Sequence, residues 1–141
     1  MESCELKPIP EAREHYIICN TNLKWLAFGM VFWSLEHDGK IPEAQGWEEK
    51  VNQCIEYDHN IEYDKAFSCP SCKKHYIYFG NGQQKDAYKE PSKVIVFLCE
   101  GEHMSMTNVA FLDGHTALLN TEEVKAAVEA AKANGSLPQM K

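Results

Sequence analysis

Apolar residues in the first quarter of the chain recur at the spacing of a helix. Between Glu11 and about Glu36 there is no proline, and Gly29 is the only glycine. The residues of one face follow one another at intervals of 4, 3, 4 and 3: Cys19, Leu23, Leu26, Met30 and Trp33. This spacing predicts a long helix that packs through this face across the rest of the domain.

Further aromatic residues lie off that face. Trp25, Phe28 and Phe32 leave the second half of the predicted helix apolar over much of its circumference. A helix of this kind is either deeply buried in its own domain or has a second contact surface. We therefore expect the three rings either to fill the core or to contact a neighbouring molecule. The helix is predicted to end where Gly39 suits a left-handed cap and Pro42 stops continuation.

The middle of the chain alternates short apolar segments with turn signals. A short helix is predicted over Trp47–Cys54. Strands are predicted at Tyr76–Phe79, Val94–Leu98, Thr107–Leu112 and His115–Leu119. The last two flank Asp113-Gly114, and a two-residue connection of this type predicts a tight hairpin turn with positive φ at both residues.

The C-terminal segment predicts another helix. Asn120 can cap its start, with Glu123 at the reciprocal position of a capping box, and Asn134-Gly135 closes it. Its inward stripe is Val124, Ala127, Val128 and Ala131. Segregated helices and antiparallel hairpins indicate the α+β class. We predict a long N-terminal helix packed on a small antiparallel sheet, plus a C-terminal helix, in one domain over residues 11–141 after a flexible lead-in at 1–10.

Composition and charge narrow the function classes. A chain of 141 residues suffices for one domain, and its 44% hydrophobic and 25% charged residues are typical of a globular protein. The formal net charge of −7 argues against the broad basic surface of a nucleic-acid-binding protein. The longest apolar run, Trp25–Trp33, is about half of the roughly 20 residues that span a bilayer.

Four residues have the types and spacing of a zinc site. Cys69 and Cys72 form a CxxC, and Cys99 and His103 form a CxxxH thirty residues later. Two thiolates on a tight turn, with a cysteine and a histidine near a strand end, would give a tetrahedral ligand set suited to zinc. The spare candidate ligands are His75 and His115. Disulfides or free thiols stay open as alternatives for the same cysteines.

Two catalytic interpretations have less support. A thioredoxin-like use of the CxxC needs a helix that starts at the motif, whereas here the segment leads into a strand at Tyr76. His103 and Asp113, with His115, contain a His/Asp pair for acid–base work, but no partnered nucleophile accompanies it. Asp113 is explained more simply as a turn residue that accepts bonds from nearby backbone N–H groups. We therefore predict a non-enzyme in which His103, Asp113 and Gly114 form a structural motif.

Two segments, taken together, resemble one family. The first is Glu11-Ala12-Arg13-Glu14 running to Cys19-Asn20-Thr21-Asn22-Leu23-Lys24, followed by His37-Asp38-Gly39-Lys40-Ile41-Pro42. It resembles the region after the membrane segment of bacterial type IV pilin-like proteins and type II secretion pseudopilins. The second places His103 nine residues before Asp113-Gly114, which lies within Asn108-Val109-Ala110-Phe111-Leu112-Asp113-Gly114-His115. It resembles the C-terminal signature of prepilin-like proteins abundant in planctomycete- and verrucomicrobia-type bacteria.

The resemblance covers roughly residues 11 to 119 and implies a pilin-like structural subunit. Its partners would be other pilin-like subunits or secretion components. Family members begin with a leader and an apolar membrane-anchoring helix, and we expect neither in this chain. We therefore expect the soluble head of such a subunit, periplasmic or on the cell surface if cut from an anchored precursor, and cytoplasmic otherwise. The alternative function is that of a small soluble zinc-binding protein that uses Cys69, Cys72, Cys99 and His103.

Overall fold

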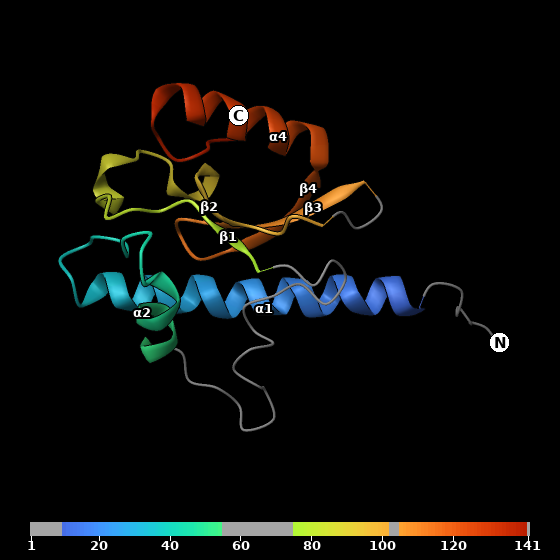
Figure 1. The fold of residues 1–141 in the computed structure, drawn as a ribbon, viewed down its shortest axis with the longest axis horizontal. Helices are drawn as coiled ribbons and strands as arrows, with labels where there is room; N and C mark the ends of the chain where they lie inside the picture. Colours follow the sequence, from blue (N-terminus) through green and yellow to red (C-terminus); the bar gives the residue numbers. More distant parts are fainter. Residues whose placement is uncertain (1–9, 55–74, 102–104, 141) are drawn as a thin grey trace.

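The computed structural model describes residues 10–54, 75–101 and 105–140, and the side chains of the first helix from Ile17 onward. Its helices are α1 (Pro10–Leu35), α2 (Trp47–Cys54) and α4 (Thr121–Asn134), and its strands are β1 (Ile77–Tyr78), β2 (Ile95–Leu98), β3 (Met106–Phe111) and β4 (Thr116–Asn120). Two short 3₁₀ helices, Lys85–Ala87 and Pro91–Lys93, connect β1 to β2. The chain therefore has the predicted α+β class (Figure 1).

The described strands form one antiparallel sheet in the order β1-β2-β3-β4, which is also their order along the chain. One irregularity interrupts the ladder: Ile95 pairs with Phe111, yet Phe97 pairs with Ala110, so two residues of β2 oppose one of β3. Val96 is the extra residue. Because of this bulge, Val96 and Phe97 both join the core cluster on the same face of the sheet.

A helix covers each face of the sheet (Figure 1). The larger core cluster joins the inner side of α1 to one face, and its α1 members are Cys19, Leu23, Leu26, Ala27 and Met30. The smaller cluster joins Val124 of α4 to Ile95, Val109 and Phe111 on the other face. The alternation along β3 fits this arrangement, since successive side chains of a strand point to opposite faces.

Trp33 does not belong to the inner face, so the prediction was wrong for this residue. Its ring is only half-buried and stacks on His37 with 3.6 Å between centroids, while the Lys50 ammonium lies 5.6 Å from it. Lys50 belongs to α2, which therefore lies beside α1 at this level. Trp33, the last residue of the predicted inner face, therefore contacts His37 in the turn after α1 and Lys50 of α2.

An aromatic cluster holds α2 on the sheet. The ring of Trp47 lies 5.1 Å from that of Tyr78 and 5.2 Å from that of Phe97. The Tyr78 hydroxyl donates to the Pro42 carbonyl at 2.6 Å, which ties the chain between the two helices to β1. Burial raises the pKa of Tyr78, so this hydroxyl keeps its proton and stays a donor.

The caps predicted at Gly39, Asn120 and Gly135 are confirmed. Gly39 has a φ of 84°, and its N–H donates to the Ser34 carbonyl at 2.9 Å beyond the end of α1. Asn120 caps α4 by accepting from the backbone N–H groups of Glu122 and Glu123, and Gly135 ends that helix in the left-handed conformation. Beyond α4, Gln139 bridges to Val94, which brings the C-terminal segment back to the start of β2.

Among the residues that the structure describes, no helix is both long enough and apolar enough to cross a membrane.

Candidate functional site

The β3–β4 turn contains the Asp113-Gly114 motif. The Gly114 N–H donates to the Phe111 carbonyl at 2.9 Å, and the Phe111 N–H donates to the His115 carbonyl at 2.8 Å. Phe111 therefore pairs with His115, and the loop inside this pair has three residues instead of the predicted two. Gly114 has a φ of 99°, whereas Asp113 is not among the residues with positive φ. The predicted two-residue turn was wrong: the loop has the pattern of a turn followed by a glycine bulge.

Asp113 acts as a turn residue, as predicted. Its carboxylate accepts from the His115 backbone N–H at 3.1 Å and contacts the His115 ring nitrogen Nδ1 at 2.5 Å. The His115 ring also stacks on Phe111, with 4.3 Å between centroids. The side chains of Asp113 and His115 are 35% and 47% exposed, so the pair lies at the surface. These contacts fix the loop, and the predicted partner His103 lies outside the described residues.

The same hairpin contacts α1. The Asn20 side-chain amide donates to the side-chain oxygen of buried Asn108 at 3.4 Å, and the Thr116 hydroxyl donates to Asn20 Oδ1 at 3.4 Å. A side chain added at Gly114 would start 3.3 Å from Val31 of α1. The first sequence motif, on α1, is therefore packed against the second, on β3 and the turn, although 88 residues separate Asn20 from Asn108.

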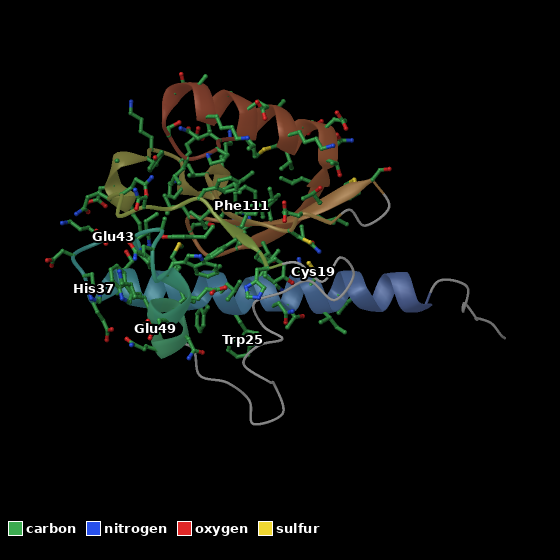
Figure 2. All side chains as sticks on the ribbon, viewed as in Figure 1. Cys19, Trp25, His37, Glu43, Glu49 and Phe111 are labelled. Atoms are coloured by element: carbon green, nitrogen blue, oxygen red, sulfur yellow. The ribbon has the colours of Figure 1, made fainter. Side chains whose placement is uncertain are left out.

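The outer side of α1 exposes large apolar side chains. Phe28 is 51% exposed, Phe32 is 43% exposed and Leu35 is 70% exposed. The rings of Phe28 and Phe32 meet edge to face with 4.6 Å between centroids. Figure 2 shows Cys19 on the side of α1 toward the sheet and Trp25 on the opposite side. Of the two predicted roles for these aromatic residues, Phe28 and Phe32 therefore do not have the core role.

Two grooves flank this outer side. One, with a volume of about 600 Å³, lies between α1 and the end of α2, and is lined by Trp25, Phe28, Phe32, Glu36, Gln53 and Cys54. The other, of about 630 Å³, lies between α1 and the β3–β4 turn, and its lining includes Lys24, Phe28 and His115. Burial, and then the nearby Glu36 carboxylate, raises the pKa of the Cys54 thiol. The thiol at the wall of the first groove is therefore less ionised than an ordinary cysteine.

The predicted zinc ligands are only partly described. Cys99 lies directly after β2 and is buried in the core cluster that also contains Cys19. Cys69, Cys72 and His103 lie outside the described residues, so the predicted approach of the first two to Cys99 stays a prediction. Of the spare ligands, His75 contacts Glu48 at 2.9 Å and His115 contacts Asp113. Within residues 10–54, 75–101 and 105–140, no group of three or more metal-ligating side chains is assembled.

The exposed outer side of α1 was only one of two possibilities that the sequence left open. The apolar circumference of α1 predicted a second contact surface or deep burial, and the sequence could not decide between them. Gln53 and Cys54 line the first groove. Nothing in the sequence indicated this role, because both residues were predicted only to end a short helix.

Comparisons with models of protein families, with curated proteins and with solved structures give no match for this chain.

Proposed function

We propose that this chain is a non-enzymatic, pilin-like structural subunit, or the soluble head of one, that works in a pilus or a type II secretion pseudopilus. The observation that carries the proposal is the contact between the two motifs. Asn20 of the Cys19–Lys24 segment on α1 is hydrogen-bonded to Asn108 of the Asn108–His115 segment on the hairpin, and to Thr116 directly after that segment. Two motifs that are far apart in sequence thus act as one packed unit, as a fold signature would.

The arrangement of α1 supports the same function. A pilin-like head consists of a long N-terminal helix laid along a small antiparallel sheet. Here the inner side of α1 provides the core of the domain, and its outer side keeps exposed aromatic rings. The largest exposed apolar patch of a soluble protein often has a binding function. A subunit that must contact its neighbours has a use for both sides of one helix.

Surface shearing of the source cells tests the proposal. An antibody raised against the purified chain is used on the sheared extracellular fraction, the envelope and the cytoplasm. We expect the antigen in the sheared or envelope fraction, co-sedimenting with other pilin-like subunits identified by mass spectrometry. Antigen confined to the cytoplasm, with no such subunit beside it, would contradict the proposal.

Metal analysis separates this proposal from the zinc-binding alternative. The chain is purified without chelator and its zinc content is measured together with that of a Cys72→Ser variant. The structural-subunit proposal does not need zinc. One zinc per chain that is lost in the variant would favour the alternative ligand set of Cys69, Cys72, Cys99 and His103.

A further inference from the structure

One row of side chains on α1 has a pattern that is complementary to itself. Lys24, Phe28, Phe32 and Glu36 follow one another at intervals of four residues, across the last turns of α1 and just beyond its end. Residues at this spacing form a continuous ridge on a helix surface. All four side chains are exposed. Along the ridge, a positively charged side chain is therefore followed by two aromatic rings and then by a negatively charged side chain.

Reversing this ridge exchanges the two charges and leaves the rings in place. A ridge of the i, i+4 type is inclined to its helix axis by about 26°, so two such ridges lie along each other when the axes cross at about 50°. If the two ridges run in opposite directions about a two-fold axis, Lys24 of each copy faces Glu36 of the other. Phe28 then faces Phe32, and the rings can adopt the edge-to-face contact that they already make within one chain.

We propose that the outer side of α1 binds a second copy of this chain in a two-fold symmetric dimer, held by the Lys24-Phe28-Phe32-Glu36 ridge. An isologous interface needs one self-complementary patch, and the reversed charges of this ridge provide it. A partner of different sequence would have to supply the same pattern in reverse, whereas a second copy has it already. The charged ends fix the register, and the rings supply the buried apolar surface.

Among the residues that the structure describes, the surroundings of the ridge leave room for the second copy. The groove toward α2 and the groove toward the β3–β4 turn lie on its two sides, with volumes of about 600 and 630 Å³. Trp25 lines both grooves, and Leu35 stays exposed nearby. The exposed apolar area of the patch is of the order of a few hundred Å² per copy, below the roughly 800 Å² per partner of a standard interface. The dimer is therefore expected to be weak and in rapid exchange.

This inference shares only the outer side of α1 with the proposed function. It names a first neighbour for that surface, but it is tested on the purified chain alone. A dimer without any pilin-like partner in the cell would leave the dimer standing and remove the proposed function. A pilin-like partner in the cell with a strictly monomeric purified chain would do the reverse.

Charge reversal tests the ridge. Sedimentation equilibrium is measured over a wide concentration range for the parent chain, Lys24→Glu, Glu36→Lys, an equimolar mixture of the two variants, and Lys125→Glu on α4 as a matched surface control. Each ridge variant turns two attractive pairs into two repulsive ones, so we expect its dimer dissociation constant to rise about tenfold. In the mixture every facing pair is again of opposite charge, so association should return as a heterodimer. The control should behave as the parent chain.

The same experiment can overturn the proposal in three ways. A parent chain that stays monomeric at millimolar concentration shows that the surface is used for another partner or for none. Dimerisation that is equally strong in both ridge variants places the interface elsewhere. Failure of the mixture to recover association removes the opposed, two-fold register. Circular dichroism of each variant checks that the fold is kept, which these exposed positions permit.

Discussion

Both sides of α1 have large apolar side chains, yet these side chains differ in burial. On the inner side, Leu23, Leu26 and Met30 are fully buried against the sheet. On the outer side, Phe28 and Phe32 keep about half of their surface exposed. The difference shows that residue type alone does not decide which side of a helix becomes core. The position of the sheet decides it, and the other side of the helix keeps its apolar side chains exposed.

The inner side should dominate the stability of the domain. Leu26→Ala removes a fully buried side chain and leaves a cavity, so we expect the free energy of unfolding to fall by about 2–5 kcal/mol. Phe28→Ala, the matched change on the outer side, should cost much less, because half of that ring already faces solvent. Urea unfolding at low protein concentration measures both. An equal decrease in the free energy of unfolding for the two variants would show that the two sides of α1 do not differ in their contribution to stability.

A smaller loss is expected where the hairpin meets α1. Gly114→Val places a β-branched residue at a φ of 99° and puts its Cβ 3.3 Å from Val31. Backbone strain of this kind costs about 1–3 kcal/mol, and the crowding adds to it. Gly46→Val is the control, since Gly46 also has a positive φ but has open space around it. Thermal unfolding should show the larger shift for Gly114→Val, and equal shifts would mean that the hairpin does not press on α1.

The polar contact between the two motifs should contribute less again. Asn20→Ala removes the hydrogen bonds to Asn108 and Thr116, each of which is 3.4 Å long. The loss should be about 0.5–1.5 kcal/mol. Thr21→Ala, one residue along and exposed, is the control. If the two variants unfold at the same urea concentration, the motifs touch without stabilising each other.

The smallest effect concerns reactivity instead of stability. The pKa of Cys54 is raised by burial and then by Glu36, so at a given pH its thiolate fraction, and thus its alkylation rate, lies below that of an ordinary thiol. Glu36→Gln removes the carboxylate charge, which should lower the pKa and speed alkylation, while the effect of burial remains. Glu43→Gln is the control. Iodoacetamide labelling against pH, followed by peptide mass spectrometry, gives the rates. An unchanged pH dependence of alkylation in the Glu36→Gln variant would show that this carboxylate does not influence the Cys54 thiol.

Local signals in the sequence predicted the elements well, because local interactions fix them. The bounds of α2 were predicted correctly, and the cap at Asn120 and the left-handed Gly39 follow from helix-capping chemistry that needs no tertiary information. The inner side of α1 was predicted as far as Met30. The prediction for Trp33 was wrong because its ring lies beside Lys50 of α2. The periodicity of one helix contains no information about a neighbouring helix.

The errors in the sheet and at the site have similar causes. An Asp-Gly pair fits a two-residue turn and also a three-residue loop, and the pairing of Phe111 with His115 selects the second. The continuous apolar run of β2 gives no sign that Val96 is a bulge. At the site, the sequence predicted that α1 has surplus apolar surface, but only the packed structure shows that this surface is exposed and that the Lys24-to-Glu36 ridge crosses it.

The central claim is that the outer side of α1 is an interface and not core. The Phe28→Ser/Phe32→Ser double variant, measured by sedimentation equilibrium beside the parent chain, tests it most directly. The account predicts a folded variant that is monomeric at concentrations where the parent chain is dimeric. A variant that dimerises as strongly as the parent chain, or that unfolds as Leu26→Ala is expected to, would contradict it.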